Sequence, residues 1–211
     1  MPELQNDPFP DLIRSYDGAV EYRESAPVSD WKVDLRCSFL TALQDEKKTS
    51  LIDIGAGTGV HALFFQESGL NVQCIDLSPA LVEKCQEKGL PVLTLSVLDL
   101  PSIGRTFDAA FALNSLLHIP SKLLGNALTN IAGVLNVGGL FYWGQYGGEY
   151  REGIYEDDQY QPKRFFSLLT DDQIQEFAAK DFTLEKFDRI LLDDSSSLHF
   201  QSLLLRVKPE K

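Results

Sequence analysis

Residues 49–65 read Thr-Ser-Leu-Ile-Asp-Ile-Gly-Ala-Gly-Thr-Gly-Val-His-Ala-Leu-Phe-Phe, and this stretch decides the fold. The apolar run at 51–54 predicts a buried parallel strand, and the apolar pattern that begins at Val60 predicts a helix. Gly55, Gly57 and Gly59 lie between them, where the backbone must turn through positive φ or approach a ligand closely. A strand, a glycine turn and a helix in this order predict a nucleotide-type pocket at the carboxyl end of a parallel strand.

The spacing of the glycines argues against a dinucleotide site. A dinucleotide fingerprint has the form Gly-x-Gly-x-x-Gly/Ala, and Val60 occupies its third glycine position. The chain has the pattern Asp-x-Gly-x-Gly-x-Gly instead, which begins at Asp53. A nicotinamide dehydrogenase is therefore a weak alternative, and the lack of a plausible Ser/Tyr/Lys proton relay disfavours it further.

The composition predicts one globular domain. The chain has 211 residues, of which 44% are hydrophobic and 24% are charged, an ordinary balance for a single buried core. Its formal charge of −12 repels a phosphate backbone, so a nucleic-acid partner is disfavoured. No apolar run approaches the ~18 residues that span a bilayer, and residues 1–10 lack the features of a signal peptide. We therefore expect no membrane partner.

The cysteines and histidines do not predict a metal site. Cys37, Cys74 and Cys85 form no Cys-x-x-Cys pair, which is typical of reduced thiols in a cytoplasmic protein. The cysteines and the three histidines show no metal-ligand spacing. The chain also lacks a Gly-x-Ser-x-Gly nucleophile elbow and a phosphate-binding Gly-Lys-Ser/Thr motif.

Strands and helices alternate through the chain. Strand patterns cover 51–54, 71–75, 91–95 and 107–113, and a fifth begins at 140–143. Helical patterns cover 12–23, a segment from Asp30 as N-cap to Leu43, and 58–67. Three further helices have recognisable ends: one is opened by Ser78 and Pro79, one is capped by Ser121 and ended by Gly138–Gly139, and one is opened by a Thr170–Gln173 capping box. Segments 183–192 and 198–207 flank a polar turn at 193–197 and predict a β-hairpin. The result is an α/β fold with a mostly parallel sheet and one antiparallel strand.

Acidic and amide residues follow successive predicted strands. Asp53 lies at the end of the first strand, Asp76 ends the second, Asp99 follows the third, and Asn114 follows the fourth. Ligands of a doubly wound sheet bind outside the carboxyl ends of its strands. Asp76 lies about 20 residues beyond the glycines, the distance at which an acid holds a ribose diol, and Asp99 could accept an exocyclic amine. Together these residues predict a nucleoside site.

At these residues the chain resembles the class I S-adenosylmethionine-dependent methyltransferases, from about Tyr16 to Val207. The resemblance rests on Asp53-Ile-Gly-Ala-Gly-Thr-Gly59, Asp76, Asp99, Phe107-Asp108 and Leu135-Asn-Val-Gly-Gly-Leu140. It implies a Rossmann-like, doubly wound, seven-stranded sheet whose antiparallel strand comes from the C-terminal hairpin. It also divides one domain, 1–211, into a helical cover (1–48), a cofactor-binding core (49–145), a substrate lid (146–169) and a C-terminal helix and hairpin (170–211).

The resemblance implies S-adenosylmethionine as the cofactor and assigns residues to it. The glycine loop, with Gly55, Ala56, Gly57 and Gly59, runs beneath the methionine part. Asp76, with Leu77 beside it, holds the ribose hydroxyls, and Asp99 with Leu98 and Leu100 frames the adenine. Asn114 lies near the sulfonium, and Tyr22 of the covering helix closes over the cofactor, as Tyr16 also could.

Catalytic and substrate residues are expected beyond the fourth and fifth strands. His118 is the titratable side chain best placed by sequence to act as a base near neutral pH, although packing in an apolar segment is the alternative. The aromatic segment 146–169 follows the fifth strand, and loops on a rigid scaffold commonly carry specificity. We predict that Tyr146, Tyr155, Arg164 and Phe165 contact the acceptor.

These features favour a methyltransferase that acts on a small molecule. Two alternatives remain open from the sequence: a regulator or partner subunit that binds S-adenosylmethionine without turnover, and a transfer-RNA methyltransferase. The Arg-aromatic-aromatic stretch at 164–166 faintly resembles that of some wobble-modifying enzymes, but the net charge disfavours RNA. The sequence identifies neither the acceptor nor the oligomeric state.

Overall fold

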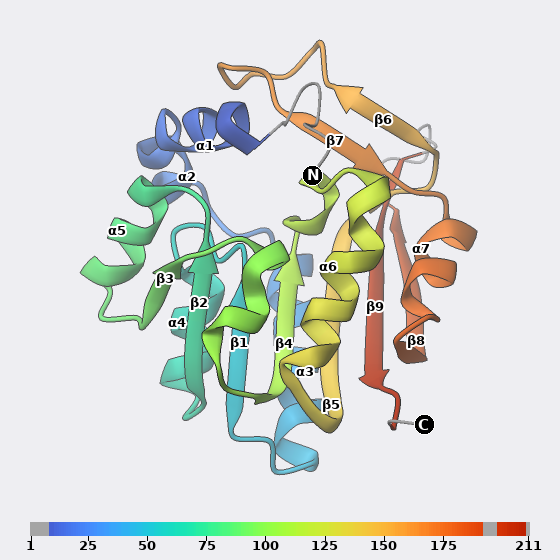
Figure 1. Cartoon of the computed structure of the whole chain (residues 1–211). Helices are drawn as coiled ribbons and strands as arrows, with labels where there is room; N and C mark the ends of the chain where they lie inside the picture. Colours follow the sequence, from blue (N-terminus) through green and yellow to red (C-terminus); the bar gives the residue numbers. More distant parts are fainter. Residues whose placement is uncertain (1–8, 192–197, 210–211) are drawn as a thin grey trace.

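Seven strands form the central sheet in the computed structural model, which describes residues 9–191 and 198–209. The strand order is β3-β2-β1-β4-β5-β9-β8 (Figure 1). Neighbouring strands from β3 to β5 pair in parallel, whereas β9 pairs antiparallel with both β5 and β8. The predicted doubly wound sheet with one antiparallel strand is therefore confirmed. The strands are β1 (Ser50–Ile54), β2 (Asn71–Asp76), β3 (Val92–Thr94), β4 (Phe107–Leu113), β5 (Leu135–Gly147), β8 (Phe182–Leu191) and β9 (His199–Val207).

Helices cover both faces of this sheet because its strands alternate apolar side chains between the faces. In β5, Phe141 and Trp143 pack into one core cluster with α6 and α7, while Leu140 and Tyr142 pack into the other with α3 and α4. The helices are α1 (Phe9–Asp17), α2 (Val20–Ser25), α3 (Asp30–Asp45), α4 (Val60–Glu67), α5 (Pro79–Glu87), α6 (Ser121–Gly133) and α7 (Asp171–Ala178), with short 3₁₀ helices η1 (Val97–Ile103) and η2 (Leu116–His118).

Several helix boundaries differ from the predicted ones. The single helix expected at 12–23 is divided at Gly18–Ala19 into α1 and α2. Ser29 and Pro120, rather than Asp30 and Ser121, hold the N-cap positions of α3 and α6, and α6 ends at Gly133. The caps with matching hydrogen bonds are confirmed: Ser78 Oγ accepts the Leu81 N–H, and both bonds of the Thr170–Gln173 capping box form.

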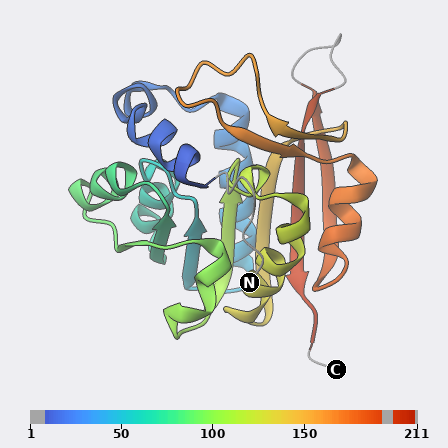
Figure 2. The same ribbon diagram turned by 45° about the horizontal axis from the view of Figure 1, so that its top comes forward.

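The segment between β5 and α7 contains a second, two-stranded sheet that the sequence did not predict. Strands β6 (Arg151–Ile154) and β7 (Phe165–Leu168) pair antiparallel. This hairpin lies above the carboxyl ends of the central strands, close to α1 (Figures 1 and 2). The C-terminal hairpin also forms, although its predicted turn at 193–197 lies outside the described residues.

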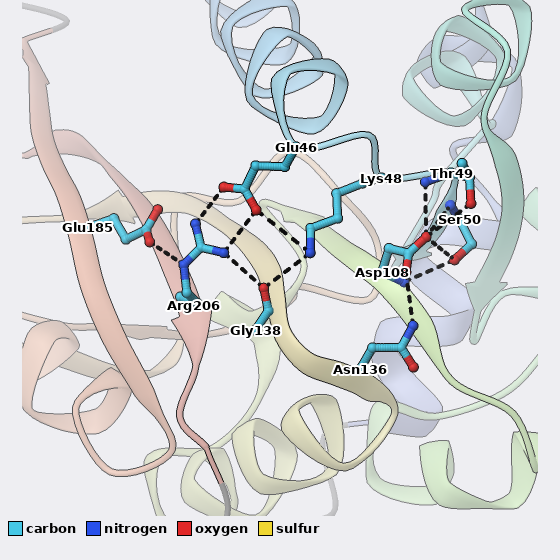
Figure 3. A network of polar contacts seen from close by, with 9 residues as sticks. All are labelled: Glu46, Lys48, Thr49, Ser50, Asp108, Asn136, Gly138, Glu185 and Arg206. Atoms are coloured by element: carbon cyan, nitrogen blue, oxygen red, sulfur yellow. Dashed lines mark hydrogen bonds and ion pairs between the residues drawn. The ribbon is translucent and has the colours of Figure 1, made fainter.

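Polar networks join the strands at the opposite, amino-terminal end of the sheet (Figure 3). Asp108 of β4 accepts hydrogen bonds from the N–H and hydroxyl groups of Thr49 and Ser50, and its other oxygen accepts one from Asn136. Arg206 of β9 pairs with Glu46 and Glu185 and donates to the Gly138 carbonyl. The two networks together connect β1, β4, β5, β8 and β9.

Asp108→Asn should lower the free energy of unfolding by about 2–3 kcal/mol, because an amide cannot accept all of these donors. Desolvation raises the pKa of Asp108, but the hydrogen bonds from Thr49, Asn136 and Ser50 outweigh it, so the pKa is lowered overall. Because its pKa is lower in the folded chain than in the unfolded chain, Asp108 stabilises the protein above about pH 3.9, the unfolded value. This contribution is lost as the pH falls below that value. Urea titrations should therefore show the variant's deficit shrinking below about pH 4. The exposed Asp99→Asn is the control, and equal losses in both variants would contradict the role of the network.

Candidate functional site

The glycine loop after β1 has the conformation that its sequence predicts. Gly55, Gly57 and Gly59 have φ values of 71°, 59° and 81°, a region that favours glycine. A Cβ at Gly55 would lie 2.4 Å from the Ser115 Cβ, and one at Gly59 would lie 2.5 Å from Leu90 Cδ1. Gly55 therefore allows the segment after β4, at Ser115, to approach the glycine loop. Gly59 allows the start of α4 to pack against Leu90 and Cys85.

A cavity opens beside this loop. Asp76 lies in its wall, 9% exposed. Its Oδ2 accepts the Gly57 N–H at 2.8 Å, and its Oδ1 accepts the Ser78 N–H at 2.9 Å. Each carboxylate oxygen keeps a second lone pair, so Asp76 can still accept hydroxyl protons from a ligand. We call this space the donor cavity; the described residues in its wall include Gly55, Gly57, Asp76, Leu77, Leu81, Leu95, Val97, Asn114 and Ile119.

Asp53 lies beneath the loop rather than in a cavity wall. Its side chain is 3% exposed, and its Oδ2 has no hydrogen-bond partner among the described residues. Desolvation, with repulsion from Asp76, raises the pKa of Asp53 to about 8. Asp53 lines neither of the two cavities beside the glycine loop, and its contact with the cofactor stays a prediction.

The adenine prediction for Leu98, Asp99 and Leu100 needs correction. Asp99 is exposed, Leu100 is fully buried in the core, and none of the three lines the donor cavity. Leu95 and Val97 supply the apolar wall in their place. Asn130 donates hydrogen bonds to the carbonyls of Val97 and Leu98, which holds η1 in this orientation.

A second and wider cavity adjoins the first, and we call it the acceptor cavity. It shares six lining residues with the donor cavity: Tyr16, Arg23, Gly55, Leu113, Asn114 and His118. Asn114 has a left-handed backbone (φ 54°), its N–H donates to the Gly144 carbonyl, and its buried Oδ1 has no partner among the described residues. Asn114 therefore presents a free acceptor where the two cavities meet.

His118 is buried at this junction, and both of its ring nitrogens have partners. Nδ1 donates to the Phe165 carbonyl at 2.7 Å, so Nε2 accepts the Tyr16 hydroxyl at 2.7 Å. Arg164 in turn donates to the Tyr16 oxygen at 3.2 Å, and Asp158 holds the Arg164 guanidinium through two oxygens. The result is a chain from Arg164 through Tyr16 to His118, with a neutral imidazole whose tautomer is fixed.

Burial lowers the pKa of His118 to about 3, against the opposing effect of its bond to Phe165. Between about pH 6.5 and pH 4 the imidazole of His118 binds a proton in the unfolded chain but not in the folded chain. The neutral imidazole therefore stabilises the folded chain above pH 6.5, and this contribution is lost as the pH falls. His118→Gln removes the contribution. Its stability relative to the unsubstituted chain should therefore improve by up to about 1.4 kcal/mol per pH unit from pH 6.5 to 4. If denaturant titrations show the unfolding free energies of the two proteins changing equally with pH, this prediction is wrong.

The predicted substrate residues divide into two groups. Tyr146 and Arg164 line the acceptor cavity, whereas Tyr155 lines a neighbouring depression on the β6–β7 hairpin that shares Tyr146 and Phe166 with that cavity. Phe165 contributes its carbonyl to His118, and the neighbouring Phe166 lines the cavity in its place. Because β7 is a strand, consecutive side chains point to opposite faces, and the prediction selected the wrong one of the pair.

The N-terminal cover carries site residues that the sequence analysis missed. Tyr22 and Ala56, which were predicted to contact the cofactor, line the acceptor cavity and not the donor cavity, and Tyr22 is 68% exposed. Arg23, next to it, lies over the glycine loop, since a Cβ at Gly57 would be 3.5 Å from its NH2. Lys32 and Tyr160 also line this cavity. Among the described residues, no three His, Cys, Asp or Glu side chains gather as a metal site, and no helix is long and apolar enough to cross a bilayer.

Part of the chain is similar to a known protein family. Residues 51–139 match a family model described as "Methyltransferase domain". The chain is 27% identical over 111 residues to magnesium-protoporphyrin O-methyltransferase of Rhodobacter capsulatus. That match covers 49% of this chain and 49% of the relative, so it spans about half of the curated protein's length.

Solved structures of methyltransferases share the fold. The 1,6-didemethyltoxoflavin-N1-methyltransferase of Burkholderia thailandensis, with bound 1,6-didemethyltoxoflavin and S-adenosylhomocysteine, superposes with a TM-score of 0.62 at 21% identity, covering 88% of this chain and 93% of that one. Magnesium protoporphyrin IX methyltransferase from Synechocystis PCC 6803, with bound S-adenosylmethionine, gives 0.67 at 13% identity, covering 98% and 100%. The predicted resemblance is thus confirmed: the chain has the class I methyltransferase fold.

Proposed function

We propose that this chain, whose residues 51–139 match the methyltransferase domain model, is an S-adenosylmethionine-dependent methyltransferase that acts on a small molecule. The observation that carries the proposal is the pair of adjoining cavities, which meet at Asn114, Tyr16 and His118. Two ligands bound side by side, with reacting atoms held at the junction, are what group transfer requires.

The residues of the donor cavity fit S-adenosylmethionine. Asp76 can accept the ribose hydroxyls, and Leu77, Leu95 and Val97 offer an apolar slot for adenine. The unpartnered Asn114 Oδ1 suits an ammonium, and Arg23 above Gly57 suits a carboxylate. When bound, the cofactor supplies an electrophilic methyl group on its sulfonium.

Tyr16 and His118 can remove a proton from the acceptor. As the acceptor's O–H or N–H proton moves to the Tyr16 oxygen, the Tyr16 proton moves to His118 Nε2 along the existing 2.7 Å hydrogen bond. The imidazole would gain one positive charge in this step, and a bound sulfonium donor would supply the compensating change, so the net charge of the site would be unchanged. Burial raises the pKa of Tyr16 against the opposing effects of Arg164 and Arg23, which favours transfer through the hydroxyl over a stable phenolate.

The β6–β7 segment, within 146–169, forms a substrate lid in this proposal. Arg164 stacks on Tyr160, with its Cζ 3.6 Å from the ring centroid, and Phe166 faces the cavity. Two hydrogen bonds connect the segment to α1: Ser15 donates to the Pro162 carbonyl, and Tyr16 accepts from Arg164. We also infer a cytoplasmic location, which the free thiols of Cys37, Cys74 and Cys85 support.

Methyl transfer to RNA is the second candidate, because cationic residues lie beside Asn114 in the acceptor cavity. One experiment separates the alternatives. The protein is incubated with a cell extract and methyl-labelled S-adenosylmethionine, and the label is followed in the metabolite and RNA fractions. Label in metabolites supports our proposal, label in RNA supports the second candidate, and cofactor binding without transfer to either supports a regulator without turnover.

A further inference from the structure

The acceptor cavity has a charge opposite to that of the chain as a whole. The sequence has 31 acidic and 19 basic residues. Among the described residues, however, Arg23, Lys32 and Arg164 line this cavity and no aspartate or glutamate does. Of the three, Arg164 is neutralised by its two-point contact with Asp158. Arg23 and Lys32 form no ion pair among residues 9–191 and 198–209.

Lys32 is held in place by aromatic rings rather than by a carboxylate. Its Nζ lies 5.1 Å from the Trp31 ring centroid and 5.9 Å from that of Tyr146. Both rings pack against the buried Phe200. Desolvation and the proximity of Arg23 lower the pKa of Lys32. Its ammonium is therefore partly removed from water without a compensating negative charge.

A third cation strengthens the positive potential on the same side of the cavity. Arg36 follows Lys32 by one turn of α3, a spacing that brings like charges together on one face of a helix. Burial, and after it the charges of Arg36, Lys32 and Arg23, lower the pKa of His61 to about 4, so all three cations act on this residue of the cavity wall. The acids of the same helix nearest in sequence, Asp30 and Asp34, are exposed and do not line the cavity.

The cofactor cannot neutralise this cluster. Its carboxylate is one negative charge, which Arg23 above the glycine loop is placed to bind, and its sulfonium adds a positive charge. Lys32 therefore remains unpaired when the donor is bound. A cationic acceptor would be repelled, and a neutral acceptor would leave Lys32 desolvated without a partner.

We propose that the methyl acceptor is a flat aromatic carboxylate and that Lys32 binds its carboxylate group. This inference rests on the proposed function and specifies its substrate class. The aromatic character follows from the rings of Tyr22, Tyr146, Tyr160 and Phe166 in the cavity wall, which offer faces and edges for stacking. With its carboxylate on Lys32, the acceptor directs its other end toward Tyr16 and His118.

Calorimetric titration tests this with defined probes. The protein is first saturated with S-adenosylhomocysteine. It is then titrated with three pairs of probes, each a carboxylate and its primary amide: 3-hydroxy-2-naphthoate, benzoate and naphthoate with their amides. We expect the carboxylates to bind about tenfold more tightly than their amides, as a charge-assisted contact predicts. In Lys32→Gln this preference should fall to about twofold or less. Lys180→Gln carries the same charge change at an exposed lysine that follows α7 and does not line the cavity, and it should keep the preference.

S-adenosylhomocysteine, the demethylated form of the cofactor, is titrated first, so a failure of cofactor binding is distinguished from a failure of acceptor binding. Tight S-adenosylhomocysteine binding without a carboxylate preference overturns the substrate inference alone, including the case in which no probe binds. The same holds if Lys32→Gln keeps the preference. Failure of the unsubstituted protein to bind S-adenosylhomocysteine or S-adenosylmethionine overturns the proposed function instead.

Discussion

Asp76→Ala is expected to weaken S-adenosylmethionine binding at least tenfold in calorimetric titrations. A hydrogen bond to a charged group is worth roughly 1.5–3 kcal/mol, and each 1.4 kcal/mol corresponds to about a factor of ten in affinity. Asp76 lies in the wall of the donor cavity, where burial raises its pKa against the hydrogen bonds from Ser78 and Gly57. The substitution removes the acceptor for the ribose hydroxyls and releases the Gly57 N–H.

Asp99→Ala is the matched control for this experiment. Both aspartates follow strands at the same edge of the sheet, but Asp99 is exposed and lies outside the cavity wall. Its substitution should leave cofactor affinity within about twofold of the original, as for surface changes away from a site. Equal losses in the two variants would restore the predicted adenine role of Asp99. Unchanged affinity in a folded Asp76→Ala protein would contradict the ribose assignment.

The difference between these two aspartates shows where sequence reasoning succeeds and where it stops. Asp76 ends a regular strand, so its position at the ligand-binding edge follows from the strand's direction and length. Asp99 lies in the 3₁₀ helix η1, whose three residues per turn bring Val97 and Leu100 to one face and turn Asp99 away. The sequence shows that an acid follows β3, but the face on which it lies depends on packing of η1 against α6.

The N-terminal helices and the segment that we propose as a lid were the least predictable parts of the candidate site. Arg23 and Lys32 belong to α2 and α3, and they reach the cavity only because these helices fold back over the loop after β1. The repeat of cations at positions 32 and 36 in an acidic chain was the one local signal. In the lid, an unpredicted strand decided between Phe165 and Phe166, since a shift of one residue reverses the face that a side chain occupies.

Tyr16→Phe is expected to lower kcat about a hundredfold with the acceptor that the labelling experiment identifies, the range found for loss of a positioned acid or base. The phenylalanine keeps the ring between His118 and Tyr160 but removes the hydroxyl that connects Arg164 to His118 Nε2. Cofactor affinity should change less than about threefold, because the hydroxyl is used in the transfer step rather than in donor binding.

His118→Ala and the double variant distinguish a proton relay from a packing role. If Tyr16 and His118 move one proton together, His118→Ala should also lower kcat about a hundredfold, and the double variant should be no slower than either single variant. Independent packing contributions would instead multiply. Tyr155→Phe, which removes a hydroxyl from the hairpin outside the acceptor cavity, is the matched control and should keep its rate. Rates near the original in both Tyr16→Phe and His118→Ala would mean that the acceptor reacts without help from these residues, because donor and acceptor are then positioned by the cavities alone.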